Sequence, residues 1–552
     1  MNFPQYLKNS LVSSFLVCHI LIALIFTSKS YAEVAQTPPM GYNTFDYWGS
    51  RIPEAQVKAA VDYMATNLKQ YGWNYFVIDY CWYYTGTGWP FPQDANWNPK
   101  VMLDEYGRVL PDPATYPSSV NGKGFKPIAD YVHGKGLKFG IHLMRGIPRQ
   151  AVAQNTPVKG TNYKAGDIYT KNDPCAWLNL QWPLNMSHPG AQAYLNSLFE
   201  QYASWDVDFV KIDDLVNPYG GSVAHEAEII GYRKAIDSCG REMVFSSSPG
   251  PTLLPTASFD ITKYVNQWRM VNDFWDKWTA LNEEFDKAKS WYKYARPGHW
   301  PDADMIPIGR LSTGLSKFTT DEKYTVMNLF CIIRSPLIWG GNLVDNTPED
   351  LKFMQNSEVL AVNQKSINNK PVDSTGNTQV WCADVPGTQI KYVGVFNRND
   401  NPANVTIKFS SLGVTTASDT LRDLWTKTNL GVFSTSYTVN LAAHQSKLYR
   451  LTPPGEKMPN DSATSIHERK VSGATVAVRA GFEAGISYGR IVVRPNNEYR
   501  KFGISVFLPD GRLVVRKDGL SGTAAIPVER GHVYIIEVKC NGTNERFKVS
   551  CF

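Results

Sequence analysis

Short apolar runs alternate with amphipathic stretches from residue 37 to about residue 355. Eight of these runs have the length and the aromatic or β-branched content of buried strands, namely 40–43, 75–79, 138–143, 208–213, 242–248, 264–269, 300–305 and 335–341. Helical patterns lie between them, after Pro53 and at 190–204, 225–238 and 322–333. The alternation predicts a (β/α)8 barrel over 33–355, with an open parallel sheet as the alternative.

The pattern changes to short strands with polar turns from about residue 356. Runs such as QVWCADV, IKYVGVFNR, NVTIKF, LRDLW and KLYRL predict an antiparallel β domain over 356–452. The segment PPGEKMPNDSATS, 453–465, has the composition of a linker. Residues 466–552 are then expected to form a further small β domain.

The first 32 residues have the features of a secretory signal peptide. Lys8 precedes an apolar segment at 11–26, and Ser30-Tyr31-Ala32 offers small residues for cleavage before Glu33. An uncleaved anchor is the alternative, but the apolar segment is shorter than the roughly 20 residues that span a bilayer. We therefore expect a secreted, periplasmic or cell-surface protein, with no membrane span after removal of the signal.

Composition excludes some classes of partner and of fold. The net charge of +6 is spread without long basic runs, so we expect no nucleic-acid partner. Of the 8 cysteines, Cys18 lies in the predicted signal, and the others do not suggest a disulfide framework. If Cys540 faces Glu545 in the last hairpin, Cys551 lies too far along the strand to reach it.

Polar and charged side chains gather at the ends of six predicted strands. They are Asp79, His142 with Arg145, Lys211 with Asp213, Ser246 to Ser248, Arg269 with Asp273, and Asp302 with Asp304. One charged strand end is commonly a helix cap or a surface ion pair. Because active sites of these barrels lie at the carboxyl ends of the strands, convergence from six of them predicts an active site.

Two of these residues predict the chemistry. Lys211 and Asp213 are two apart on one strand, so both face the barrel axis, and the lysine keeps the carboxylate ionised as a nucleophile requires. Asp273 is the best candidate for a second carboxylate that donates a proton, as in glycoside hydrolysis. No HExxH, GxSxG or phosphate-binding glycine loop occurs, so we expect no metal and no cofactor.

Seven motifs, in order and spacing, resemble those of glycoside hydrolase family 27, the retaining α-galactosidases and their relatives. They are TPPMGYNTF (37–45), VIDYCW (77–82), GLKFGIH (136–142), FVKID (209–213), WRMVND (268–273), PGHWPDADM (297–305) and SPLIWGGNL (335–343). RDLW at 422–425 and the strand that ends in LYRL resemble the family's C-terminal β domain. The resemblance covers residues 37 to 451.

This resemblance implies roles for individual residues. Asp213 takes the position of the nucleophile and Asp273 that of the acid/base, while Lys211 and Arg269 match sugar-binding residues. Asp304, with Met305, matches a further pair that lines the sugar pocket. The implied enzyme is an exo-glycosidase that removes terminal α-D-galactosyl residues from a carbohydrate with retention. The sequence carries no signal for an oligomeric state.

Four positions depart from the family pattern. Tyr80 replaces the second of two aspartates, so that only Asp79 remains to hold the axial 4-hydroxyl and its neighbour. His142 stands where the family often has tyrosine, Ser248 lies near a position that often contacts the 2-hydroxyl, and Leu215 replaces a disulfide cysteine. Either the galactose pocket is unchanged, or specificity has shifted, for example toward β-L-arabinopyranosides. A different class of protein, a non-catalytic barrel that only binds glycans, is a further alternative. The presence of both carboxylates argues against it.

The last ninety or so residues fall outside that family. The segment FGISVFLPDGRLVVRKDG and the strands after it resemble the C-terminal sorting β domains of bacterial secreted proteins. A sugar-binding module is the alternative for this domain.

Overall fold

The computed structural model describes residues 34–85, 100–216, 225–414 and 418–458, and strand segments between 469 and 551. The predicted signal peptide at 1–32 and much of the predicted linker at 453–465 lie outside the described residues. The chain divides into two compact units, Met1–Glu456 and Lys457–Phe552.

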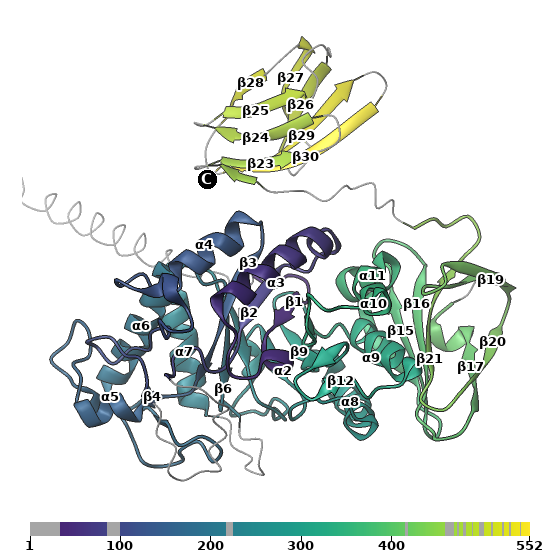
Figure 1. Cartoon of the computed structure of the whole chain (residues 1–552). Helices are drawn as coiled ribbons and strands as arrows, with labels where there is room; N and C mark the ends of the chain where they lie inside the picture. The colour runs from purple at the N-terminus through teal and green to yellow at the C-terminus, as the bar shows by residue number, and fades with distance from the viewer. Residues whose placement is uncertain are drawn as a thin grey trace, which may run out of the picture. The chain divides into compact units, whose positions relative to one another are not determined.

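Nine parallel strands form a curled sheet in the order β10-β13-β1-β2-β3-β6-β7-β8-β9. Their bounds are Met40–Asn43 (β1), Tyr75–Ile78 (β2), Lys138–Met144 (β3), Phe209–Asp213 (β6), Val244–Ser247 (β7), Gln267–Arg269 (β8), Trp300–Asp302 (β9), Met305–Ile306 (β10) and Leu337–Trp339 (β13). β9 and β10 stand at opposite ends of this order but follow each other in the chain. Together they take the seventh strand position, and the predicted barrel is confirmed (Figure 1).

Helices and short strands connect the barrel strands. The helices are Phe45–Trp48 (α2), Glu54–Asn67 (α3), Lys126–Gly134 (α4), Arg149–Gln154 (α5), Pro189–Ser204 (α6), Glu226–Ser238 (α7), Trp278–Trp291 (α8), Thr320–Ile332 (α9), Pro348–Gln355 (α10) and Ser357–Lys365 (α11). The short strands are Ile147–Pro148 (β4), Gln181–Trp182 (β5), Arg310–Leu311 (β11) and Gly314–Leu315 (β12). Local signals fix several helix starts: Pro53 precedes α3, and Thr319 and Glu322 bond each other's backbone N–H in a capping box at α9.

The seventh predicted strand, 300–305, is interrupted in the structure. Asp304 has a φ of 72°, and its backbone N–H donates to Asp302 Oδ1 at 2.9 Å instead of to a neighbouring strand. The backbone N–H of Ala303 donates to Ser335 Oγ at 2.9 Å. The prediction of one continuous strand is therefore wrong, because side-chain acceptors satisfy the backbone at this point.

An antiparallel β-sandwich follows the barrel. Its strands are Ile367–Asp373 (β14), Thr378–Asp384 (β15), Lys391–Asn397 (β16), Ala403–Lys408 (β17), Asp419–Asp423 (β18), Thr428–Phe433 (β19), Ser436–Leu441 (β20) and Ser446–Thr452 (β21). A six-stranded sheet, β14-β15-β16-β21-β18-β19, faces the pair β17-β20 across a shared apolar core. The first strand begins at Ile367, later than the change of pattern at residue 356, because 357–365 is still helical.

The β-sandwich is joined to the barrel by polar contacts and by ring stacking. Arg398 donates to Asn282 Oδ1 at 2.7 Å and to Asp286 Oδ1 at 2.9 Å, both on α8. His444 stacks on Trp278, with 3.6 Å between the ring centroids. Three residues of α8, Trp278, Asn282 and Asp286, thus hold the β-sandwich against the barrel.

The second unit forms another pair of antiparallel sheets. Its strands are Arg469–Val471 (β22), Ala474–Val478 (β23), Phe482–Ser487 (β24), Arg490–Pro495 (β25), Phe502–Phe507 (β26), Leu513–Leu520 (β27), Ala524–Pro527 (β28), His532–Cys540 (β29) and Thr543–Cys551 (β30). Alternate residues such as Ile504 and Val506 on one sheet meet Ile491 and Val493 on the other in one core. Cys540 pairs with Thr543 in the backbone register, so the expected pairing with Glu545 is wrong by two residues.

None of the helices in the described part of the chain has the length and the apolar character needed to cross a membrane. The cysteines whose side chains the structure describes are all free: Cys81, Cys175, Cys239, Cys331 and Cys382.

Candidate active site

A pocket of about 870 Å³ opens at the carboxyl ends of the barrel strands. Six of the predicted site residues line it: Asp79, Tyr80, Lys211, Asp213, Asp273 and Asp304. The other three predicted residues, His142, Ser248 and Arg269, lie behind this wall and contact residues of it. The structure therefore brings all of the predicted site residues together.

Lys211 lies at the centre of the charged groups. Alternation along β6 turns Lys211 and Asp213 to the same face, while Ile212 is buried on the other. Lys211 Nζ is 3.0 Å from Asp79 Oδ2 and 4.0 Å from Asp213 Oδ1. Asn43 Nδ2 also donates to Asp79 Oδ2, at 2.6 Å, so that Asp79 is fixed from two sides.

Asp213 is ionised by its surroundings in spite of its burial. Burial alone would raise the pKa of this carboxyl, but the charge of Lys211 and the contacts with His142 and Ser248 hold it well below its ordinary value. The pKa of Asp79 is also lowered, because Lys211 and Asn43 outweigh its burial. Lys211 in turn has a raised pKa, since three carboxylates outweigh the effect of burying the ammonium group.

Arg269 connects two carboxylates of different exposure. Its Nη2 donates to Asp273 Oδ1 at 3.0 Å, and its Nη1 is 2.8 Å from Asp304 Oδ1. The Asp273 side chain is 68% exposed, whereas that of Asp304 is 4% exposed. Burial, together with the nearby charge of Asp273, raises the pKa of Asp304 to about 6. Asp273 is therefore the carboxylate that faces the open part of the pocket.

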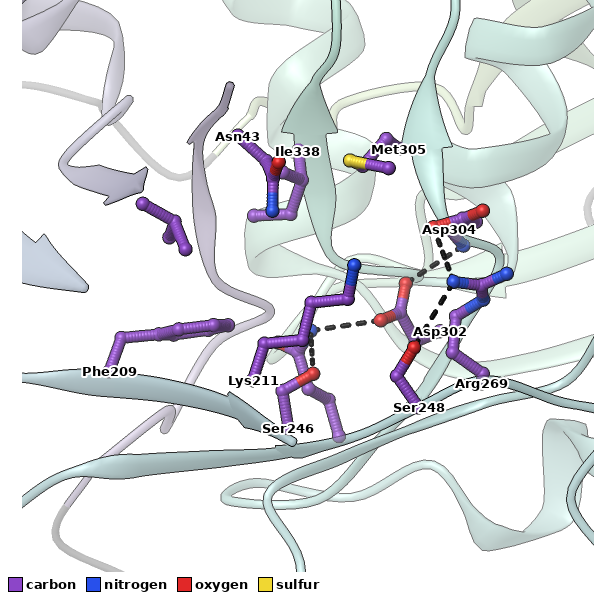
Figure 2. A pocket seen from close by; sticks show the side chains of 12 residues that line it. Asn43, Phe209, Lys211, Ser246, Ser248, Arg269, Asp302, Asp304, Met305 and Ile338 are labelled. Carbon is purple, nitrogen blue, oxygen red and sulfur yellow. Dashed lines mark hydrogen bonds and ion pairs between the residues drawn. The ribbon is translucent and has the colours of Figure 1, made fainter. Parts of the chain in front are cut away.

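A polar network lies beneath the pocket and holds these side chains (Figure 2). Gln267 Nε2 donates to Ser246 Oγ at 3.1 Å and to Asp302 Oδ2 at 2.9 Å. Arg269 Nη1 donates to Ser248 Oγ at 3.3 Å. These bonds surround a small cavity of about 20 Å³ inside the barrel and restrict the rotamers of the charged residues above it.

Tyr80 lines the pocket, and His142 packs against it from behind. The two rings meet edge to face with their centroids 5.6 Å apart, and His142 Nε2 lies 3.0 Å from Asp213 Oδ2. His142 is fully buried, and Tyr80 is 8% exposed with its hydroxyl beside the Cys81 thiol. An aromatic ring thus stands directly after Asp79, where the resemblance implied a second aspartate.

Two charged residues near the predicted strand ends, Arg145 and Asp214, have a structural role. Arg145 donates to Asp214 Oδ2 at 2.9 Å and to Glu228 Oε2 at 2.7 Å, and none of the three lines the pocket. The charges at the end of β6 therefore divide: Lys211 and Asp213 face the pocket, whereas Asp214 binds Arg145, which links it to Glu228 on α7. Residues 217–224, which follow this segment, lie outside the described residues.

Asp46 is a pocket residue that was not predicted from the sequence. This residue is buried on α2, directly after the TPPMGYNTF motif, and it lines the pocket. Burial and the nearby charge of Asp304 raise its pKa well above the ordinary value. Its place three residues after the first strand end is the signal that could have identified it.

One group of potential metal ligands occurs among the described residues, Asp130, His133 and Asp206. Lys126 forms ion pairs with both of these aspartates, and Arg241 is 2.7 Å from Asp206 Oδ1. The group lies outside the pocket, and cations already compensate its carboxylates.

Comparisons with known proteins agree with this arrangement. The family models described as Alpha galactosidase A and as Alpha galactosidase C-terminal beta sandwich domain match residues 181–365 and 375–451. The crystal structure of a GH27 β-L-arabinopyranosidase from Geobacillus stearothermophilus is 42% identical, with a TM-score of 0.74, over 78% of this chain and 100% of that chain.

Two curated relatives are α-galactosidases. The enzyme of Cyamopsis tetragonoloba is 28% identical over 426 residues, which are 76% of this chain and 87% of that protein. Alpha-galactosidase A of Homo sapiens is 27% identical over 405 residues, which are 69% of this chain and 79% of that protein.

Proposed function

Because this chain belongs to glycoside hydrolase family 27, we propose that it is a retaining exo-glycosidase that releases terminal β-L-arabinopyranosyl units in preference to α-D-galactosyl units. Asp213 attacks the anomeric carbon and forms a glycosyl-enzyme, while Asp273 donates a proton to the leaving oxygen. Asp273 then takes a proton from water, which displaces Asp213 and restores the configuration.

The environments of the two carboxylates support these roles. Lys211 keeps Asp213 ionised as a nucleophile must be. Asp273 is exposed to the open pocket, where a leaving group and then water can reach it, and Arg269 orients it.

Tyr80 carries the preference for arabinopyranosides. β-L-Arabinopyranose has the ring hydroxyl arrangement of α-D-galactose but has hydrogen where galactose has its C6 hydroxymethyl group. Tyr80 follows Asp79 in the pocket wall, and its aromatic ring, packed against His142, takes the place of a carboxylate that would bind that hydroxymethyl. The 42% identical β-L-arabinopyranosidase supports this order of preference.

An α-galactosidase is the second candidate, and the one that the sequence analysis placed first. Asp79, Lys211, Arg269 and Asp304 remain to bind the hydroxyls that both sugars share. The curated α-galactosidases that match more than two thirds of this chain support this reading.

A panel of 4-nitrophenyl glycosides tests the proposal. We expect kcat/KM to fall in the order β-L-arabinopyranoside, α-D-galactoside, and then α-N-acetylgalactosaminide and α-glucoside. NMR of the first product should show the substrate's anomeric configuration. A higher value for the α-galactoside would favour the second candidate, and an inverted first product would exclude the double displacement.

A further inference from the structure

Arg149 is a cation in the pocket wall that has no carboxylate partner among the described residues. It begins α5, directly after β4, and lines the same pocket as Asp213 and Asp273. Its Nε donates to the carbonyl oxygen of Gln181 at 3.1 Å, which leaves both terminal NH2 groups without a described acceptor. Lys211, which also lines the pocket, and Arg269, which lies behind its wall, are each compensated by carboxylates.

The position of this guanidinium is fixed. It stacks on the Trp182 ring, with its central carbon 3.6 Å from the ring centroid. Trp182 belongs to β5, which pairs with β4, so that Pro148 faces Gln181 in the register and the backbone N–H of Arg149 donates to the carbonyl oxygen of Leu180 at 2.9 Å. Because the guanidinium is stacked and its Nε–H is already bound, its two terminal NH2 groups point in one direction and in one plane. Two parallel donors of this kind suit a planar anion such as a carboxylate.

The wall around Arg149 offers further donors and contact area. Residues 174–179, which lead into β5, line the pocket beside it, and the buried indole N–H of Trp177 has no described acceptor. These residues come from segments other than those that carry Lys211, Asp79 and Asp304. Since the pocket of about 870 Å³ has room for more than one pyranose ring, this wall is available to the leaving group.

We propose that Arg149 selects a leaving group that carries a carboxylate, as in a uronic acid residue to which the released sugar is attached. This inference rests on the proposed function, because it concerns the leaving-group side of the same site. Arg149 binds the carboxylate end-on through its two terminal NH2 groups, while the Trp182 ring holds the guanidinium plane. A neutral leaving group gains nothing from this contact and leaves the cation unpaired.

Two aryl glycosides of the preferred sugar, the 4-carboxyphenyl glycoside and its methyl ester, test the proposal. We expect the wild-type protein to have a kcat/KM for the carboxylate that is about tenfold or more above that for the ester. Arg149→Gln should abolish this preference, and Arg149→Lys should retain only part of it because lysine lacks the planar fork. The ratio within each variant removes general effects on folding and on the chemical step.

A measurement on the wild-type protein alone gives a second test. Raising the ionic strength from about 0.01 to about 1 M should increase KM for the carboxylate and leave KM for the ester nearly unchanged. Equal kcat/KM for both glycosides, or a preference that survives in Arg149→Gln, would overturn the role of Arg149. If the wild-type protein hydrolyses neither of these glycosides nor any member of the 4-nitrophenyl panel, the proposed function itself has failed.

The kind of anion can be separated in the same experiment. A 4-sulfophenyl glycoside carries a negative charge on a tetrahedral group, whereas the fork of Arg149 has one plane. We expect the carboxylate to be preferred over the sulfonate. A better sulfonate substrate would overturn the assignment to uronic acids.

Discussion

If Asp213 is the nucleophile, the charge of Lys211 should set the pH range in which it acts. Lys211→Met removes the cation that lies 4.0 Å from Asp213 Oδ1, so burial should then raise the pKa of this carboxyl. In the wild-type protein, the acidic limb of the pH profile of kcat/KM should lie below the ordinary pKa of aspartate if Asp213 alone sets it. In Lys211→Met this limb should move to higher pH by about one unit or more. An activated aryl glycoside makes the measurement independent of leaving-group protonation.

Lys138→Met is the matched control for that variant. Lys138 lies on β3 and bonds the Tyr75 hydroxyl at 3.2 Å, outside the pocket. Its replacement should leave the limb in place. If Lys211→Met also leaves the limb in place, another group sets it.

The two carboxylates should respond differently to removal. Asp273→Ala should still form a glycosyl-enzyme from an activated aryl glycoside, and azide should accelerate its breakdown to a glycosyl azide with retained configuration. Asp213→Ala should lose the retaining reaction. Asp214→Ala is the control, since Asp214 bonds Arg145 outside the pocket. If Asp214→Ala lost the retaining reaction as Asp213→Ala is expected to, the assignment of the nucleophile to Asp213 would be wrong.

Tyr80 should set the ratio between the two candidate substrates. Tyr80→Asp restores a charged acceptor for the C6 hydroxyl, and a hydrogen bond to a charged group contributes about 1.5 to 3 kcal/mol. The kcat/KM of α-galactoside relative to β-L-arabinopyranoside should rise roughly tenfold or more. Tyr80→Phe, which keeps the ring against His142, should change the ratio little. An unchanged ratio in a well-folded Tyr80→Asp protein would show that position 80 does not contact the sugar.

At the scale of elements, close packing of the first two strands depends on Gly41. A Cβ at this position would lie 2.2 Å from the carbonyl oxygen of Tyr75, on the neighbouring strand β2. Gly41→Ala must therefore push the strands apart and should cost about 1 to 3 kcal/mol of unfolding free energy. Thermal or denaturant unfolding measures this loss.

Gly134→Ala is the control for that substitution. Gly134 ends α4, and a Cβ there would meet nothing within 4 Å. This change should be neutral or slightly stabilising because alanine favours the helix. Equal effects of the two substitutions would show that the approach of β1 to β2 is not as tight as 2.2 Å implies.

Sequence patterns predicted elements where burial alone decides them. β1 and β2 are buried at every position, and their runs were found nearly to the residue. The patterns failed at Ala303 and Asp304, where bonds to Ser335 and Asp302 replace those of the strand. α8 was also missed, although its buried residues recur at helical spacing, and its contact with the β-sandwich through Asp286 and Arg398 joins segments distant in sequence.

Much of the candidate site could also be predicted, because its residues follow from the strand pattern. Asp79, Lys211, Asp213 and Arg269 stand at strand ends, where the topology of a barrel brings residues together whatever their separation in the chain. Arg149 and the residues before β5 come from a long excursion after β3, and no local pattern shows that this excursion returns to the pocket. The residues proposed to bind the sugar were therefore easier to identify than the residue proposed to bind the leaving group.

At the scale of the whole molecule, the chain should unfold in two parts. A protein that ends at Glu456 lacks the second unit but keeps the barrel and the β-sandwich, and we expect its kcat/KM to stay within about twofold of the full chain. Calorimetry should show that one transition disappears. A large loss of activity in the shortened protein would assign the second unit a part in catalysis.

The contacts of Arg398 and His444 with α8 also bear on how such proteins can be reassembled by gene recombination. A crossover between barrel and β-sandwich would separate Arg398 from Asp286 and His444 from Trp278, and would uncover a helix that both halves share. A crossover near Lys457 would exchange a unit that has its own apolar core. We therefore expect barrel and β-sandwich to be inherited as a pair, and the C-terminal unit to be the cassette in which relatives differ.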